Sequence, residues 1–177
     1  LNVPTIIRLG LLLAAALLLA CSFAAALTIS PAFAAALFGY LALTTAYTFW
    51  LKRKLMVDIV VLAMLYTSRV ICGAIAIGVG VSEWLLAFSM FVFFSLALVK
   101  RCSELVSMRE LGKNEARGRS YFVGDLTVLW PLGVGAALAA IVVFGLFINS
   151  PDTLARYHSP TLLWLTAAGL LYWLSHL

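Results

Sequence analysis

The chain has 177 residues, of which 64% are hydrophobic and only 11% are charged. Soluble domains of ordinary composition carry about 25% charged residues, so this chain has too little polar surface to cover a globule of its size in water. It is basic, with 12 Lys and Arg against 7 Asp and Glu. The composition excludes an ordinary soluble domain and predicts an integral membrane protein surrounded mostly by lipid.

Six apolar segments are long enough to cross a bilayer, which takes about 20 mainly apolar residues. In chain order they cover residues 5–29, 31–50, 56–78, 82–99, 123–148 and 160–177. The predicted fold is therefore all-α, a polytopic bundle of transmembrane helices. No internal repeat and no soluble domain interrupts the series.

Local signals account for the breaks between these segments. Proline disfavours a helical residue before it, so Ser30-Pro31 predicts a tight turn. Ser82 follows a glycine-rich stretch and is expected to cap the fourth span, with Glu83 in its first turn. Pro131 is expected to kink the fifth span without ending it.

The basic residues lie almost entirely on one side of the predicted membrane. That side holds Arg8, Lys52, Arg53, Lys54, Lys100, Arg101, Arg109, Lys113, Arg117 and Arg119. The positive-inside rule assigns it to the cytoplasm. The one long polar segment, 100–122, belongs to the same side, and we expect a cytoplasmic loop there with an amphipathic helix followed by a turn at Gly118. Three aromatic residues near span ends are expected to be interfacial anchors: Trp50, Trp84 and Tyr121.

Arg69 lies near the middle of span 56–78, where a charge costs at least a few kcal/mol unless it faces the bundle interior or a wet cavity. Asp58 precedes it by eleven residues, just over three helical turns, so both should lie within about 20° on one inward face. Gly73 and Gly80 continue that side and would admit a neighbouring helix. Arg69 is therefore a candidate functional residue. The alternative is a structural tie to a backbone carbonyl or to another helix.

Two further charge clusters lie at the basic ends of the spans. In the first, Lys52 and Arg53 follow Tyr47, although a topogenic loop held by anionic lipid would give the same pattern. In the second, at the end of span 82–99, Lys100 and Glu104 are an i,i+4 pair, in the order that is less favourable for helix stability. A solvated charged face would look the same.

Both clusters and the face of Arg69 open to one side of the membrane, which suggests an anionic ligand. Arginine binds phosphate oxygens in a planar fork and lysine acts as a point charge, so phosphate or diphosphate is the obvious candidate. The chain has no phosphate-cradling glycine loop, no nucleophile–histidine pair and no metal-type cysteine spacing. Nucleic-acid binding is not expected, because the basic residues lie at the membrane without an aromatic platform.

These motifs together resemble the middle and later helices of the UbiA-superfamily membrane prenyltransferases. The residues that carry the resemblance are Tyr47-x-x-x-x-Lys52-Arg53, Asp58, Arg69-x-x-x-Gly73, Trp84 and Lys100-Arg101-x-x-Glu104-Leu105. The chain is most similar to the branch that includes decaprenyl-phosphate phosphoribosyltransferase and proteins in which a UbiA-like domain is fused to a phosphatase-like (HAD) domain. The resemblance implies a nine-helix bundle, of which residues 1–177 form a partial domain, about helices three to eight.

The resemblance also implies a Mg²⁺-dependent transferase with diphosphate as the leaving group and a polyprenyl phosphate or diphosphate lipid as substrate. Its first aspartate-rich motif, which holds Mg²⁺, would lie upstream of Leu1. In ordinary members the second motif is Asp-x-x-x-Asp, which is here replaced by the segment 100–104, and the Tyr-to-Lys spacing is one residue longer than in ubiquinone-type enzymes. Both departures favour phosphoribosyl transfer to polyprenyl phosphate over prenyl transfer to an aromatic acceptor.

The resemblance further implies roles for individual residues. Phosphate or diphosphate binding falls to Lys52, Arg53, Lys100 and Arg101, with Tyr47 as a further substrate-binding candidate. Arg69 and Asp58 are the catalytic candidates, Arg69 binding a phosphate or orienting the acceptor deeper in the cavity. Asp58 and Glu104 would orient the cations or hold a second Mg²⁺.

The resemblance places the protein in a bacterial inner membrane among membrane lipids, with a fused or partner phosphatase-like domain as a further expectation. Two other classes stay open: a membrane transporter, and a non-catalytic membrane protein that handles an anionic lipid. A transporter would favour broken helices in two matched halves, which the sequence does not show. A scaffold gives no reason for Arg69.

Overall fold

The computed structural model of the protein describes residues 3–54, 56–112, 121–157 and 159–176. Within these ranges every regular element is a helix: α1 (Val3–Ile29), α2 (Pro31–Phe49), η1 (Leu51–Arg53), α3 (Val57–Ala76), α4 (Glu83–Glu110), η2 (Val123–Asp125), α5 (Leu126–Ile148), α6 (Pro151–Arg156), η3 (Pro160–Leu162) and α7 (Leu163–Ser175). The all-α prediction is confirmed.

Four helical stretches are long and apolar enough to cross a membrane: Pro31–Arg53, Val57–Ala76, Glu83–Glu110 and Val123–Ile148. Two shorter apolar stretches, Leu13–Ile29 and Leu163–Ser175, belong to the first and last predicted spans. Each of the six predicted segments is thus helical, and four of them meet the criterion within the described residues. The chain is a multi-pass membrane protein.

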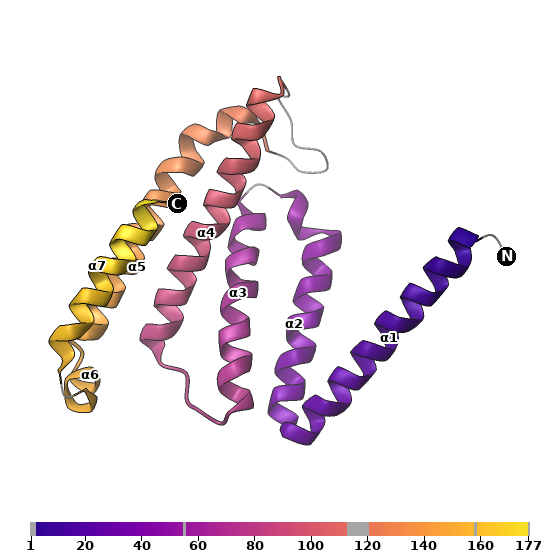
Figure 1. Cartoon of the computed structure of the whole chain (residues 1–177), viewed down its shortest axis with the longest axis horizontal. Helices are drawn as coiled ribbons and strands as arrows, with labels where there is room; N and C mark the ends of the chain where they lie inside the picture. Colours follow the sequence, from indigo (N-terminus) through magenta and orange to yellow (C-terminus); the bar gives the residue numbers. More distant parts are fainter. Residues whose placement is uncertain (1–2, 55, 113–120, 158, 177) are drawn as a thin grey trace.

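The helices lie side by side in chain order, from α1 at one edge to α5 and α7 at the other (Figure 1). The main contacts between long helices join α1 to α2, α2 to α3, α3 to α4, α4 to α5 and α5 to α7. Because the long helices alternate in direction, the α2–α3 turn, the end of α4 and the start of α5 come together at one edge, the upper one in Figure 1. This edge holds both predicted charge clusters.

A hydrophobic core cluster lies near that edge, between α3, α4 and the start of α5. Its buried members are Ile59, Ala97, Leu98, Cys102, Leu105, Tyr121 and Leu129. Further down, α4 and α5 approach closely. The Ser95 hydroxyl donates to the Gly133 carbonyl at 3.0 Å, and a Cβ on Gly133 would lie 3.3 Å from the Leu98 Cβ. Small residues at such contacts let transmembrane helices pack backbone to backbone.

The predicted breaks are confirmed with two differences. Ser30 caps α2 by accepting a hydrogen bond from the Phe33 amide at 2.9 Å, and α5 continues through Pro131. Ser82 holds the N-cap position of α4, but its side chain makes no capping hydrogen bond.

The second difference concerns the segment after the fourth span. Residues 100–110, where an amphipathic helix is expected, are helical, but they continue α4 without interruption, so the helix does not end with span 82–99. Leu105 is buried there and Met108 packs against the core, so the apolar face of α4 extends past the end of the purely apolar run. The predicted turn at Gly118 lies outside the described residues.

Candidate functional site

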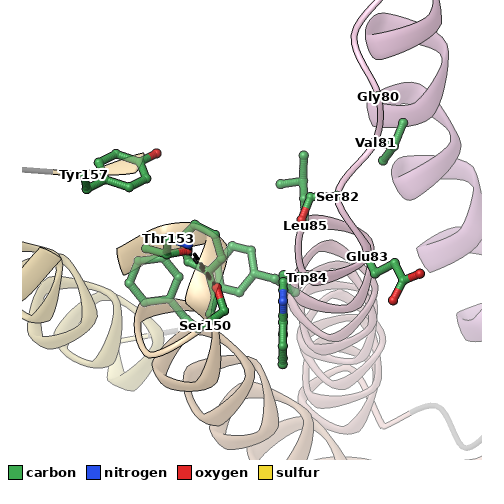
Figure 2. Close-up of a pocket in the computed structure, with 12 residues that line it drawn as sticks. Gly80, Val81, Ser82, Glu83, Trp84, Leu85, Ser150, Thr153 and Tyr157 are labelled. Carbon is green, nitrogen blue, oxygen red and sulfur yellow. Dashed lines mark hydrogen bonds between the residues drawn. The ribbon is translucent and has the colours of Figure 1, made fainter. Parts of the chain in front are cut away.

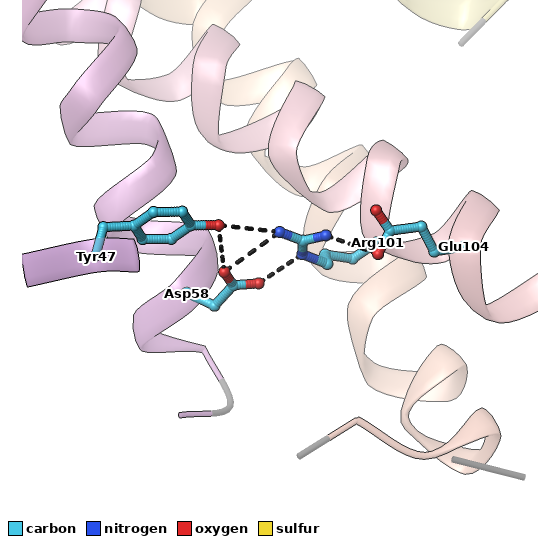
Figure 3. Close-up of polar contacts among 4 residues, drawn as sticks. All are labelled: Tyr47, Asp58, Arg101 and Glu104. Carbon is cyan, nitrogen blue, oxygen red and sulfur yellow. Dashed lines mark hydrogen bonds and ion pairs between the residues drawn. The ribbon is translucent and has the colours of Figure 1, made fainter. Parts of the chain in front are cut away.

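A buried ion pair joins α3 to α4 at the basic edge (Figure 3). Arg101 Nε donates to Asp58 Oδ2 at 2.5 Å, and Arg101 Nη2 donates to Asp58 Oδ1 at 3.3 Å. The side chains of Arg101 and Asp58 are 2% and 0% exposed. An unpaired charge buried this far would be strongly destabilising, so each residue depends on the other.

Two further predicted residues complete the cluster. The Tyr47 hydroxyl on α2 donates to Asp58 Oδ1 at 2.7 Å, and Arg101 Nη1 donates to Glu104 Oε2 at 2.7 Å. Arg101 Nη2 also donates to the Tyr47 hydroxyl, at 3.3 Å. We call Tyr47, Asp58, Arg101 and Glu104 the polar cluster; it links α2, α3 and α4.

Local structure explains why these side chains meet. The chain leaves α2 through η1 and enters α3 after Met56, whose backbone φ of 63° reverses its direction. Asp58 then lies in the first turn of α3, where the positive end of the helix dipole favours a carboxylate. The reversal brings Tyr47 and Asp58, eleven residues apart, into contact.

One pairing in this region differs from the sequence spacing. Glu104 lies at i,i+4 from Lys100, but its carboxylate pairs with Arg101 at i,i+3. One helical step turns a side chain by about 100°, so Arg101 faces the core while Lys100 is exposed. Lys52 and Arg53 lie in η1 at the same edge, half-buried and exposed respectively.

Arg69 lies deeper along α3 and also contacts α2. Its Nε donates to the Tyr40 hydroxyl at 2.9 Å, and its Cζ lies 5.6 Å from the Tyr40 ring centroid and 5.1 Å from that of Tyr66. Both distances fall within the range of cation–π attraction. Tyr66 stacks in turn on Phe93 of α4, with ring centroids 5.4 Å apart.

The predicted common face of Asp58 and Arg69 is confirmed, because both side chains contact tyrosines of α2. The expectation that Arg69 points into the interior is wrong for the described residues, where its side chain is exposed. A Cβ at Gly73 or Gly80 would meet no atom within 4 Å, so none of the described helices packs closely there. The contact with Tyr40 is a structural tie between Arg69 and another helix, as the alternative to a functional role predicts. A functional role of Arg69 stays a prediction.

Two tyrosines near the predicted residues were not assigned to the site. Tyr40 could have been found, because it lies seven residues, two helical turns, before Tyr47 and so shares its face. Tyr121 had no such signal, since 19 residues separate it from Arg101. It was predicted to be an interfacial anchor, which is wrong, because it is 2% exposed and belongs to the core.

The hydroxyl of Tyr121 is one of the buried polar atoms that make no hydrogen bond within the described part of the chain. Burial raises the pKa of Tyr121 above its ordinary value, and the negative charge of Asp58 raises it further. The ring packs in the core cluster with Ile59 and Cys102, the chain neighbours of Asp58 and Arg101. The hydroxyl is therefore a protonated donor beside the polar cluster.

The described residues contain no group of three or more His, Cys, Asp or Glu side chains that could hold a metal ion. Asp58 and Glu104, the candidates for a second Mg²⁺, both bind Arg101 instead. Both oxygens of Asp58 accept hydrogen bonds. The described residues do not fit a Mg²⁺ site, and we derive no chemical step through this ion.

A separate pocket of about 570 Å³ lies at the opposite edge, between the start of α4, the end of α5 and α6 (Figure 2). Its walls include the aromatic side chains of Trp84, Phe88, Phe144 and Phe147 together with polar residues such as Glu83. Trp84, which contributes to the family resemblance, lines this pocket, whereas no candidate site residue does. The pocket and the polar cluster are thus two distinct regions of the molecule.

The fold and the polar cluster together define a multi-pass membrane protein with a buried, charged site at its basic edge. No family model matches the chain. It is 38% identical over 143 residues to the uncharacterized protein y4nM of Sinorhizobium fredii, which covers 78% of this chain and 27% of that protein.

Two further relatives carry more specific names. The chain is 36% identical over 110 residues to the nodulation protein NoeC of Azorhizobium caulinodans, covering 62% of this chain and 36% of the relative. It is 31% identical over 114 residues to the decaprenyl-phosphate phosphoribosyltransferase of Mycolicibacterium smegmatis, covering 64% and 35%. The protein is thus a distant homologue of decaprenyl-phosphate phosphoribosyltransferases. The matches span only 27% to 36% of these three relatives.

Proposed function

We propose that the protein is a UbiA-type membrane transferase that acts on a polyprenyl phosphate lipid, with phosphoribosyl diphosphate as the donor. The observation that carries the proposal is the polar cluster, in which four candidate site residues, among them the phosphate-binding candidate Arg101, converge at the basic edge. The distant homology to decaprenyl-phosphate phosphoribosyltransferases supports the same choice of substrates. Prenyl transfer from an allylic diphosphate is the other reaction of the same class.

In the proposed reaction, an oxygen of the polyprenyl phosphate attacks the first carbon of the phosphoribosyl group. The bond from that carbon to the diphosphate oxygen breaks, and diphosphate departs with the electron pair. Positive charge develops on carbon and negative charge on the leaving oxygens, so fixed cations around those oxygens lower the barrier. Lys52, Arg53, Lys100 and Arg101 at the basic edge are the cations proposed for this role.

Arg69 is proposed to bind a phosphate or to orient the acceptor deeper in the membrane. Its guanidinium is exposed, and Nε is its hydrogen-bonded nitrogen within the described residues. The apolar faces of the helices offer a surface for the isoprenoid chain. We extend the proposal to the whole protein in three respects: dependence on Mg²⁺, a cytoplasmic basic edge in a bacterial inner membrane, and a phosphatase-like partner domain.

The proposal is tested with purified full-length protein, Mg²⁺ and decaprenyl phosphate, supplied with either phosphoribosyl diphosphate or an allylic diphosphate and an aromatic acceptor. We expect product with the first donor. Arg69→Ala should abolish turnover while the protein remains folded, whereas Arg109→Ala, an exposed arginine at the end of α4, should leave turnover unchanged. Wild-type turnover in Arg69→Ala would remove Arg69 from the mechanism. Transport of decaprenyl phosphate without product would favour the transporter class.

A further inference from the structure

The surroundings of Arg101 conflict with its proposed role in phosphate binding. Each nitrogen of its guanidinium already donates to a protein oxygen: Nε to Asp58, Nη1 to Glu104 and Nη2 to Asp58 and Tyr47. The side chain is also only 2% exposed. Arg101 therefore cannot accept a phosphate as a bidentate ligand in this arrangement unless it gives up a partner.

The partner that Arg101 would give up is then left buried. Asp58 is fully buried, and two of the three hydrogen bonds that its carboxylate accepts from described residues come from Arg101. A buried carboxylate that loses a charged donor is strongly destabilised unless another donor replaces it. Arg101 can thus leave Asp58 for a phosphate favourably only if another hydrogen-bond donor lies next to Asp58. We call this change of partners the exchange.

The Tyr121 hydroxyl meets this requirement. It is buried, it makes no hydrogen bond within the described ranges, and its ring packs in the core cluster with Ile59 and Cys102, the chain neighbours of Asp58 and Arg101. Packing alone does not explain the hydroxyl, because a phenylalanine ring would fill the same core position. A buried polar group without a partner in a native structure calls for a specific reason.

We propose that Tyr121 is a positioning residue. When a phosphate group takes the place of Asp58 on Arg101, the Tyr121 hydroxyl donates a hydrogen bond to the released Asp58 carboxylate. Without a ligand Arg101 binds Asp58, and the Tyr121 hydroxyl makes no hydrogen bond to any described residue. In the liganded state the guanidinium turns to the phosphate oxygens, and Asp58 accepts hydrogen bonds from Tyr47 and Tyr121. The inference rests on the proposed function, since it needs a phosphate group that reaches Arg101.

The exchange predicts opposite behaviour for two matched tyrosine variants of the full-length protein. Tyr47→Phe removes a hydroxyl that already binds Asp58, so it should lower the unfolding temperature without ligand. Tyr121→Phe removes a hydroxyl that has no partner, so the unfolding temperature without ligand should stay the same or rise. The variant should differ from wild type only in ligand binding, with an affinity for the phosphate probe about tenfold weaker or more. This is the usual effect of losing a hydrogen bond to a charged group. Tyr157→Phe, an exposed tyrosine at the opposite edge, is the control for both measurements.

The measurements are thermal unfolding in detergent and equilibrium binding of two probes, decaprenyl phosphate and inorganic diphosphate. The two probes distinguish a lipid phosphate from a donor-type diphosphate as the group that draws Arg101 away. If Tyr121→Phe lowers the unfolding temperature without ligand and binds both probes as tightly as wild type, Tyr121 is structural and the exchange is wrong. If wild type binds neither probe, the proposed function fails first and the exchange with it. Binding by wild type that Tyr121→Phe leaves unchanged overturns the exchange alone.

Discussion

Removal of one member of the buried ion pair should destabilise the protein far more than removal of both. Arg101→Met keeps most of the side-chain volume but leaves the Asp58 carboxylate buried, with Tyr47 as its remaining donor among the described residues. Breaking a buried pair in this way costs about 3–5 kcal/mol. Asp58→Asn should have a similar cost, because Arg101 then keeps its charge at 2% exposure with only the partly exposed Glu104 as an anionic partner.

The double variant supplies the decisive comparison. In Asp58→Asn with Arg101→Met no unpaired charge remains in the pair, and such replacements are often neutral or stabilising. We therefore expect the double variant to be more stable than either single one. For a chain of 177 residues, about 1 kcal/mol corresponds to roughly 2–4 °C in unfolding temperature, so the single variants should unfold roughly 6–20 °C below wild type.

The assay is thermal unfolding of the four proteins in one detergent, at one pH and protein concentration. Glu104→Gln is the matched control, because Glu104 binds the same guanidinium at 38% exposure and exposed pairs contribute at most about 1 kcal/mol. Strictly additive effects of the two single changes would show that the charges do not depend on each other. That result would refute the buried-pair reasoning.

Three further outcomes follow from contacts elsewhere in the fold. Gly133→Leu should displace α5 from α4, because even a Cβ at this position would lie 3.3 Å from the Leu98 Cβ. The protein should therefore unfold at a lower temperature than the control Gly135→Leu, where a Cβ meets nothing within 4 Å. Tyr40→Phe removes the hydroxyl that accepts from Arg69 but keeps the ring. Turnover should fall, while the unfolding temperature should change by only a few degrees. Unchanged turnover would contradict a positioning role for Tyr40. Burial raises the pKa of Tyr121 in the folded protein, so above pH 10.0 the unfolded chain loses this proton more readily than the folded one. Stability should therefore not depend on this ionisation below pH 10.0 and should fall above it. An alkaline unfolding series should show this loss in wild type and less of it in Tyr121→Phe.

The sequence contains enough information to place the helices because their ends carry local signals. Apolar runs, Ser30-Pro31 and the segment after Ser82 mark boundaries that the structure reproduces within a few residues. The continuation of α4 to Glu110 was missed, because a hydropathy rule ends a span at the first charged residues. The interior contact of Leu105 depends on the neighbouring helices, which no local pattern encodes.

The members of the polar cluster could be predicted, but the pairing within it could not. Charged residues at helix ends identify Asp58, Arg101 and Glu104 as candidates. Which guanidinium or ammonium faces the carboxylate depends on the rotation of α4 against α3, and one residue of rotation decides between Lys100 and Arg101. Tyr121 lies beside the polar cluster only because the start of α5 packs against α4. The spacing of residues along the sequence does not reveal such a long-range contact.

The two arginines within the helices differ in what a ligand must displace. Arg101 is buried and each of its guanidinium nitrogens donates to a protein oxygen. Arg69 is exposed, with a hydrogen bond from Nε and two tyrosine rings beside its guanidinium. A phosphate at Arg69 would not have to break an ion pair, since none involves this residue in the described part of the chain. Arg101 becomes available only after Asp58 has changed partner. The proposed function and the exchange together therefore imply an order, in which phosphate binding at Arg69 requires no rearrangement and phosphate binding at Arg101 requires the movement that Tyr121 supports.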